Sequence, residues 1–423
     1  MLTQIELRHF KCFELLKLPL APLTLLAGAN ASGKSTVLQA IGLLHQSVNV
    51  SPWESRLLLN GPVLRLGRAA DVIDQVHGRR SCSITILDSF VKRPAGRPDL
   101  RIVREKSRAG RSGSAPTLEE LARDIEARRA ARGTASYSWD FEGEPADRSL
   151  RLACLRYEDE VTSRSVGPDG EGPVLLSLEE DPGFRDRLER LHYLTAERLG
   201  PRDSYRLRDS EEDFAIGPAG ENAAALLEAG GSDKVLPGLV LGDAPPTRFR
   251  QIEARMASFF PGCVLDVQQL PAAGVVMLGI RTSDDTEFHR PVHTGFGLTQ
   301  VLPIVIAALS AGHDALLLIE NPEVHLHPSG QARMGHFLAE VAAAGVQVLV
   351  ESHSDHVLNG IRRAVKAGIL APDRAALHFF SPRSEDAPQV QTPTMDAEGG
   401  LDFWPGGFFD QFDKDLSALA GWD

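Results

Sequence analysis

The chain has 423 residues, of which 43% are hydrophobic and 24% are charged, proportions that fit a globular protein with a sizeable core. The formal net charge of −12 argues against a protein that coats nucleic acid over its whole surface, although it leaves room for a local basic groove. The four cysteines lack metal-binding or redox spacing, no apolar stretch is long enough to span a membrane, and the N-terminus lacks the features of a signal peptide. We therefore expect a cytoplasmic protein with reduced thiols.

The N-terminal segment predicts a hairpin that leads into a buried strand and a helix. Apolar residues alternate with polar ones from Ile5 to Phe13, as in an antiparallel hairpin. The next apolar run, Leu23–Ala27, is short and ends at a glycine, which is typical of a buried strand. Residues 35–44 have the periodicity of a helix.

A phosphate loop lies between this strand and this helix. Residues 28–36 read Gly-Ala-Asn-Ala-Ser-Gly-Lys-Ser-Thr, and both glycines permit the chain to curl so that backbone N–H groups face an anion. We expect Lys34 to reach the outer phosphates of ATP and the Ser35 hydroxyl to bind the Mg²⁺ that bridges them. A chance glycine-rich turn is the alternative, and the order of strand, loop and helix argues against it. The candidate nucleotide-binding residues are Gly28, Asn30, Ala31, Ser32, Gly33, Lys34, Ser35 and Thr36.

The middle of the chain contains fewer chemical signals. Residues 93–117 are rich in Arg, Gly, Ser and Pro and predict a mobile loop. A charged helix predicted over Glu119–Arg132 is more typical of a solvated face than of a nucleic-acid contact. Further predicted elements are strands at Cys82–Phe90, Ser149–Tyr157 and Val174–Leu178, helices at Pro182–Leu191, Glu221–Ala229 and Thr247–Phe260, and a hairpin at Val264–Arg281.

The apolar run Ala315–Ile319 is followed by Glu320, the pattern of a buried parallel strand that presents an acid at its C-terminal end. In phosphate-loop enzymes that acid holds the magnesium ion, usually through water. His325 and His327 follow with the spacing of some metal ligands, but no further ligand completes a set. A structural turn is therefore the favoured interpretation of these two histidines.

Two further polar segments complete the predicted site. His353 follows the apolar strand Gln347–Val350 at a position from which an imidazole can hydrogen-bond a terminal phosphate. Gly295 and Gly297 precede an apolar helix predicted over Val301–Leu309, which gives a second helix N-terminus suited to an anion.

In this order, the phosphate loop, the glycine-rich turn, the strand ending in Glu-x-Pro and the later Ser-His resemble the ATP-binding-cassette (ABC) ATPases. The resemblance is to their soluble branch, which contains chromosome-maintenance (SMC) and recombination ATPases and the OLD-family nucleases. More specifically, the chain resembles a bacterial group of AAA-type ATPases of uncharacterised function. The shared motifs stand at Ala196–Arg202, Glu320–Pro328, Ser352–His356 and Trp404–Asp410.

The resemblance implies an α/β fold, a P-loop NTPase with an ABC-type head in which helices flank a mixed β-sheet and an α/β region is inserted. Residues 1–92 would form the N-terminal part of the head and 93–290 an insertion or arm. Residues 291–395 would form the C-terminal part, and the aromatic tail 396–423 would pack on the head or dock a partner.

The resemblance also assigns roles to residues. His353 becomes the switch histidine, and Gly295–Gln300, through Gly295, Gly297, Thr299 and Gln300, becomes a divergent signature that meets ATP bound by a second protomer. That arrangement implies a homodimer with two ATP molecules at its interface. The candidate magnesium-binding residues are Ser35, Glu320 and, on spacing alone, Gln75.

One residue departs from the cassette pattern. The residue after the magnesium acid is usually a glutamate that polarises the attacking water, whereas here it is Asn321, whose amide can orient water but cannot accept its proton. Glu323 is the candidate substitute, and a slow ATPase would behave as a nucleotide-dependent switch. The candidate catalytic residues are Glu320, Asn321, Glu323 and His353.

The leading hypothesis is a magnesium-dependent ATPase that dimerises around ATP and controls a nucleic-acid process or a separate effector such as a nuclease. Genome maintenance and anti-phage defence are the expected settings, with DNA as a candidate ligand and no membrane. Two alternatives stay open. The first is the ATP-binding subunit of a membrane transporter, against which the signature Gly-Phe-Gly-Leu-Thr-Gln departs from the transporter sequence Leu-Ser-Gly-Gly-Gln. The second is a non-catalytic ATP-binding scaffold, which Asn321 keeps open.

Overall fold

The computed structural model describes residues 1–50, 55–74, 78–91, 132–159, 162–167, 182–207, 216–383, 388–407, 409 and 411–421. Within these ranges the strands form sheets of six, seven and three strands. Gln75, most of the charged helix expected at 119–132 and the strand expected at 174–178 lie outside the described residues, so those expectations stay predictions.

The six-stranded sheet carries the phosphate loop. Its order is β16-β15-β3-β14-β13-β9, and all neighbouring strands run parallel except β16. The central strands β3, β14 and β13 are almost wholly buried because apolar residues cover both of their faces. The strand bounds are β3 (Leu23–Gly28), β9 (His192–Leu194), β13 (Leu316–Glu320), β14 (Gln347–Glu351), β15 (Ala375–Phe380) and β16 (Val390–Gln391).

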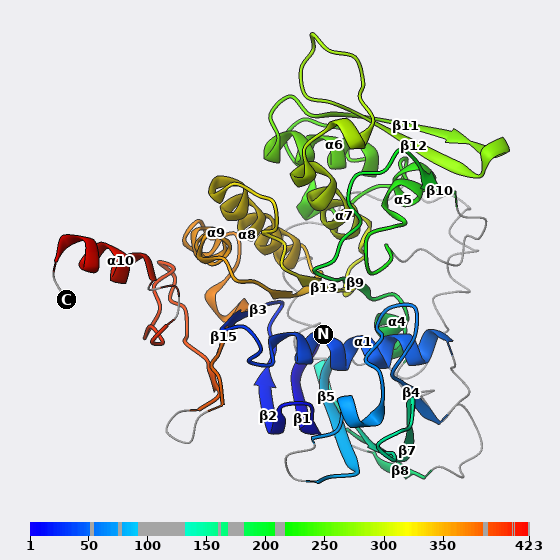
Figure 1. The fold of residues 1–423 in the computed structure, drawn as a ribbon, viewed down its shortest axis with the longest axis vertical. Helices are drawn as coiled ribbons and strands as arrows, with labels where there is room; N and C mark the ends of the chain where they lie inside the picture. Colours follow the sequence, from blue (N-terminus) through cyan, green and yellow to red (C-terminus); the bar gives the residue numbers. More distant parts are fainter. Residues whose placement is uncertain are drawn as a thin grey trace, which may run out of the picture.

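Helices cover both faces of this sheet (Figure 1). Alternate side chains of β3 point to opposite faces, so that Leu26 joins one hydrophobic core and Leu25 joins the other. The first core contains α1, and the second contains α7, α8 and α9. The helix bounds are α1 (Lys34–Val50), α7 (Phe296–Ser310), α8 (Pro328–Ala343) and α9 (Asp355–Lys366).

Helix α1 runs to Val50, beyond the end predicted at residue 44. Its later turns contain His45, Gln46 and Ser47, whose polar side chains interrupt the apolar periodicity although all three are buried. His45 Nδ1 lies 2.5 Å from the carbonyl oxygen of Leu188, and Ser47 Oγ donates to a carbonyl of its own helix. The helix continues because tertiary contacts satisfy these polar groups.

The seven-stranded sheet is antiparallel, and β1 and β2 form the hairpin predicted before the phosphate loop. Its buried face packs on α1 and α4, where the rings of Tyr137 and Phe184 stack with centroids 4.2 Å apart. The bounds are β1 (Leu2–Phe10), β2 (Phe13–Pro19), β4 (Arg56–Leu58), β5 (Ser81–Val91), β6 (Arg132–Glu142), β7 (Ser149–Asp159), β8 (Ser163–Val166) and α4 (Pro182–Glu189).

The three-stranded sheet packs with α5, α6 and α7 at one end of the molecule, the top in Figure 1. Its strands β11 and β12 form the predicted hairpin, in register from Val264 opposite Arg281 to Leu270 opposite Val275. The bounds are β10 (Tyr205–Arg206), β11 (Val264–Leu270), β12 (Val275–Arg281), α5 (Ala223–Ala229) and α6 (Arg248–Phe259).

The expected insertion at 93–290 contributes to both large sheets. Strand β9 pairs with β13 in the parallel sheet, and β6 pairs with β5 along its whole length in the antiparallel sheet. These are non-local pairings that local sequence patterns do not reveal. The division of the chain at residues 92 and 290 stays a prediction.

The C-terminal tail ends in α10 (Gln411–Ala420), which lies away from the sheets (Figure 1). The guanidinium of Arg362 lies 5.6 Å from the ring centroid of Trp404, while Trp404 and Phe403 are each 44% exposed. The tail is therefore only partly packed on the head. No helix within the described ranges is both long and apolar enough to cross a bilayer.

Candidate nucleotide-binding site

The phosphate loop joins β3 to α1 with two glycines in backbone conformations that other residues rarely adopt. Gly28 has a φ of 128° and Gly33 a φ of 103°, and a Cβ on Gly28 would lie only 2.0 Å from the carbonyl oxygen of Phe380. Asn30 and Ala31 are exposed at the tip of the loop. Ser32 is buried and its hydroxyl donates to the Ala29 carbonyl at 2.7 Å.

Lys34 lies within the curl of the loop. Its side chain is buried, and Nζ donates to the carbonyl oxygens of Gly28 at 3.2 Å and Ala29 at 2.6 Å. Burial lowers the pKa of Lys34, and the neighbouring carboxylates of Glu351 and Glu323 oppose that shift. The ammonium group is thus held at the loop with carboxylates nearby.

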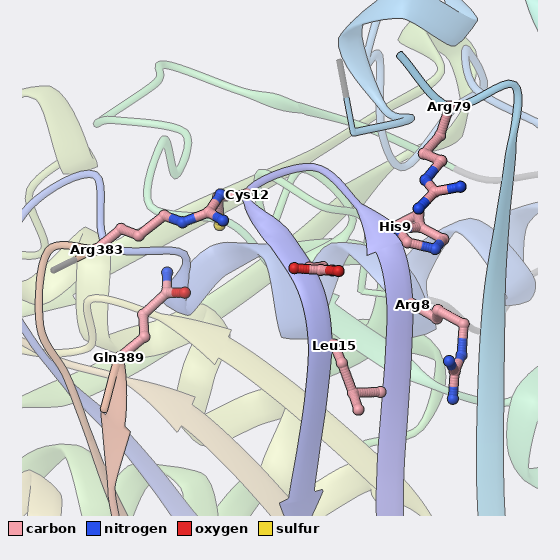
Figure 2. A pocket seen from close by; sticks show the side chains of 8 residues that line it. Arg8, His9, Cys12, Leu15, Arg79, Arg383 and Gln389 are labelled. Carbon is pink, nitrogen blue, oxygen red and sulfur yellow. The ribbon is translucent and has the colours of Figure 1, made fainter. Parts of the chain in front are cut away.

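A cavity of about 500 Å³ adjoins the outer side of the loop. Figure 2 shows arginine side chains on both sides of it, Arg8 and Arg79 from one and Arg383 from the other. Gln389 lines the cavity and donates to the carbonyl of Ser32, while Cys12 packs close to Gly33. Two of the residues that line the cavity, Cys12 and Gln389, therefore contact the phosphate loop.

Glu320 ends β13 and has both carboxylate oxygens engaged. Tyr193 donates its hydroxyl to Oε1 at 2.5 Å, and the backbone N–H of Ala196 donates to Oε2 at 3.0 Å. Both donors follow or belong to β9, the neighbouring parallel strand. The sequence placed Glu320 at a strand end, and the structure adds the two groups that orient it.

Glu351, at the end of β14, was missed by the sequence analysis. Parallel pairing sets it beside Glu320, and the residue is 5% exposed. Burial raises the pKa of Glu351 to about 7; hydrogen bonding by the Ser35 hydroxyl opposes the shift and the Glu320 carboxylate adds to it. The sequence does contain a signal for Glu351, because Leu-Val-Glu at the end of β14 repeats the Leu-Ile-Glu at the end of β13.

Glu323 ties together the loops that follow β13 and β14. Its Oε2 accepts a hydrogen bond from Ser352 Oγ at 2.9 Å, and its Oε1 accepts one from the backbone N–H of His353 at 2.7 Å. The His353 ring remains accessible, with Nε2 4.0 Å from Oε1 of Glu351. Burial lowers the pKa of His353, and the charge of Lys34 acts in the same direction.

Asn321 has a φ of 44°, in the left-handed region that asparagine tolerates better than most residues. Its backbone N–H donates to the carbonyl of Glu351 at 2.8 Å. Its side-chain Oδ1 is buried and has no hydrogen-bond partner among the described residues. The backbone of Asn321 is therefore fixed beside that of Glu351, and its catalytic role stays a prediction.

Arg198, from the Ala196–Arg202 motif, is a site residue whose role the sequence did not reveal. It is buried, and its guanidinium donates to the carbonyl oxygens of Glu320 and Asn321, each at 2.6 Å. It also donates to the Thr195 carbonyl at 3.1 Å. Burial lowers the pKa of Arg198 to about 10, against the opposing charges of Glu323 and Glu320. The arginine thereby fixes the backbone of the loop after β13.

The predicted signature residues lie at the start of α7. Gly295 is the N-cap residue, so the helix begins earlier than the predicted Val301. Thr299 donates to the Phe296 carbonyl within the first turn, Gly297 packs against the carbonyl of His325, and Gln300 Nε2 lies 3.4 Å from the carbonyl of Arg198. Helix α7 belongs to the core on the opposite face of the parallel sheet from α1.

The paired histidines after β13 have structural roles. The His327 ring accepts a hydrogen bond from the backbone N–H of Ser329 and caps α8, while the ring of His325 lies 5.4 Å from that of Phe296. Among the described residues, no group of three or more His, Cys, Asp or Glu side chains could hold a metal ion.

Family models match three parts of the chain. A model described as an AAA ATPase domain matches residues 1–108, and one described as an AAA domain, associated by name with the AbiEii toxin of a type IV toxin–antitoxin (TA) system, matches residues 185–359. The OLD nuclease of Thermus scotoductus is 46% identical over 44 residues, which span 10% of this chain and 8% of that protein. These matches identify AAA-type ATPase sequence in two separate parts of the chain and support the resemblance to the SMC/OLD-like ABC-type ATPases. A third model, described as a protein of unknown function (DUF3696), matches residues 370–419.

Solved SMC heads align with this chain over most of its length. The SMC head bound to the C-winged helix domain of ScpA covers 93% of this chain and 98% of its own, with 14% identity and a TM-score of 0.48. The SMC head domain of Pyrococcus furiosus with an extended coiled coil, bound to the C-terminal domain of ScpA, covers 99% of both chains with 12% identity and a TM-score of 0.46. The predicted α/β P-loop fold, in which helices flank a mixed β-sheet, is confirmed.

Proposed function

We propose that this protein is a magnesium-dependent ATPase that dimerises around ATP and acts as a nucleotide-dependent switch on a partner effector. The observation that carries the proposal is the convergence, at the C-terminal edge of one parallel sheet, of the phosphate loop with Glu320, Glu351 and His353. Parallel strands present such groups at one edge, where ligands of open α/β sheets bind. Lys34 supplies the cation for the phosphates.

The donor set fits magnesium held together with a nucleotide. Mg²⁺ takes oxygen ligands, commonly one or two carboxylates together with substrate phosphates, and the site offers the Ser35 hydroxyl and carboxylates. When bound, the ion would neutralise phosphate charge. Ser35 and Glu320 would hold it, while Lys34 would position the outer phosphates and His353 would contact the terminal one.

The predicted role of the signature requires a second copy of the chain. The contacts described for Gln300 and Gly297 run to Arg198 and to the loop after β13. At the same helix start, Gly295 is exposed and Phe296 is 55% exposed, although phenylalanine is usually buried. An exposed helix N-terminus beside an exposed aromatic ring suits an interface that receives the phosphates of another protomer.

The proposed function also includes a partner protein and a cellular process in which the switch acts. A separate effector such as a nuclease, with DNA as a candidate ligand, fits the similarity to an OLD nuclease and to an AAA domain associated by name with a toxin–antitoxin system. Genome maintenance or anti-phage defence would be the setting.

The first test is ATP hydrolysis by the purified protein, with and without double-stranded DNA, while light scattering follows the dimer. We expect Mg²⁺-dependent hydrolysis that Lys34→Ala abolishes together with ATP binding. Lys17→Ala, which removes an exposed lysine from β2, is the matched control and should behave like the wild type. Unchanged ATP affinity in Lys34→Ala would contradict the phosphate-loop assignment.

A second candidate function is a non-hydrolysing ATP switch, favoured by Asn321 at the usual glutamate position. Both oxygens of Glu323, the candidate substitute base, already accept hydrogen bonds from the loop after β14. Glu323→Gln separates the functions. Loss of hydrolysis with ATP-driven dimerisation retained would support Glu323 as the base, whereas ATP-driven dimerisation without hydrolysis in both proteins would support the switch.

A further inference from the structure

Glu351 lies between the two residues expected to hold magnesium. The parallel register of β13 and β14 places it directly beside Glu320, so both side chains leave the sheet at the same edge and on the same face. On its other side β14 pairs with β3, where Glu351 lies opposite Leu26, so the phosphate loop that contains Ser35 leaves the sheet next to Glu351. A carboxylate that joins the phosphate-loop serine to the acid of β13 is therefore built into the fold.

The second oxygen of Glu351 is left without a partner. Glu320 and Glu323 each have both carboxylate oxygens engaged by hydrogen-bond donors. Oε2 of Glu351, by contrast, is buried and has no hydrogen-bond partner among the described residues. A buried acceptor without a hydrogen-bond partner destabilises the fold, and a charged one does so more strongly. This arrangement is explained if a cation, or the water it carries, is the missing partner.

The chemistry of the surroundings favours a small divalent cation. The nearest described cation, Lys34, directs its Nζ to the carbonyl oxygens of Gly28 and Ala29. No three ligand-type side chains in the described part of the chain could hold an ion by themselves, so oxygens of phosphate or water would complete its coordination. Mg²⁺ binds in this manner, through one or two carboxylates and substrate phosphates.

We propose that Glu351 is a second carboxylate of the magnesium site, which receives a magnesium-bound water or the ion itself when nucleotide is present. This inference rests on the proposed function. It follows that three carboxylates, Glu320, Glu323 and Glu351, repel the phosphates of metal-free ATP, while the magnesium complex neutralises them. The ligand of this protein is accordingly a divalent cation–nucleotide complex, and metal-free nucleotide binds poorly.

The experiment measures binding of a non-hydrolysable ATP analogue, AMP-PNP, by calorimetry in Mg²⁺ and in EDTA. We expect the wild type to bind far more tightly with Mg²⁺. In Glu351→Gln the ratio of the two affinities should fall by about tenfold or more, the usual effect of losing a group that supports a metal ligand. Electron paramagnetic resonance of Mn²⁺ with AMP-PNP should show correspondingly weaker ion binding, a readout independent of turnover.

Two further variants make the test specific. Glu197→Gln removes the same charge from an exposed glutamate in the segment next to Glu320 and should keep the wild-type ratio. Glu351→Asp keeps the carboxylate but shortens it, and should retain more of the Mg²⁺ effect than Glu351→Gln. Thermal unfolding of each variant checks that it is folded.

The outcomes distinguish the proposed role of Glu351 from the proposed ATPase function. A wild-type affinity ratio and wild-type Mn²⁺ binding in Glu351→Gln would overturn the role of Glu351 while leaving the ATPase proposal intact. A folded wild-type protein that binds no AMP-PNP in either condition would overturn the proposed function, and the role of Glu351 with it.

Discussion

Replacing Arg198 by methionine tests whether its guanidinium fixes the loop after β13. Methionine is of similar length and uncharged, so the variant keeps apolar contacts but loses the hydrogen bonds to the carbonyl oxygens of Thr195, Glu320 and Asn321. Hydrogen bonds to a charged group contribute about 1.5–3 kcal/mol each, so the three together contribute about 4.5–9 kcal/mol.

The variant also avoids the cost of burying a charge. Burial lowers the pKa of Arg198 from 12.5 to about 10, a difference that corresponds to roughly 3 to 4 kcal/mol at about 1.4 kcal/mol per pKa unit. The middle of the range for the three hydrogen bonds is about 7 kcal/mol. Subtracting the cost of burying the charge leaves an expected loss of about 3 kcal/mol in the free energy of unfolding.

Urea denaturation followed by circular dichroism measures this loss. Arg202→Met is the matched control, because Arg202 belongs to the same motif but is exposed, and it should stay within about 0.5 kcal/mol of the wild type. An Arg198→Met variant that also stays within about 0.5 kcal/mol would refute the view that the guanidinium holds this loop in place.

Three further predictions concern the surroundings of the site. Gly28→Ala should lower the free energy of unfolding by about 2–6 kcal/mol, because its Cβ would meet the Phe380 carbonyl oxygen in a backbone conformation that alanine rarely adopts; an unchanged urea midpoint would contradict this. Tyr193→Phe removes one donor from Glu320 and should weaken binding of Mg²⁺ with AMP-PNP in calorimetry, whereas equal affinity would show that Ala196 alone orients the carboxylate. Burial lowers the pKa of His378 from 6.5 to about 4, so the unfolded chain takes up a proton first as the pH falls. The free energy of unfolding should therefore decrease between pH 6.5 and pH 4, by at most about 3 kcal/mol. The slope of the unfolding free energy against pH should be smaller in His378→Gln, and an identical slope would exclude this histidine as its source.

The parts of the fold that depend on local pattern could be predicted. The phosphate loop is a continuous motif between a strand and a helix, and Glu320 ends an apolar run, so neighbouring residues reveal both. Helix α7 was predicted too short, because Gly295 and Gly297 suggested a turn where the structure starts a helix. The roles assigned to the site residues, and the division into domains, stay predictions.

What the sequence did not reveal depends on contacts between distant segments. Tyr193 and Arg198 act on Glu320 and Asn321 only because β9 pairs with β13, and a three-residue strand gives almost no periodic signal. Glu351 was not predicted as a site residue, because the Ser-His that follows it matches the family motif and Glu351 does not. Its importance appears only when the strand register sets it beside Glu320.

The hydrogen bond between Gln300 and the Arg198 carbonyl has a consequence for signalling. From the first turn of α7, one hydrogen bond reaches the backbone of Arg198, and one more, from its guanidinium, reaches the carbonyl of Glu320. If a second copy of the chain contacts the start of α7, a displacement there reaches the backbone of Glu320, the proposed magnesium ligand, through two hydrogen bonds and the side chain of Arg198. The position of the Arg198 side chain would then couple dimerisation to ATP hydrolysis.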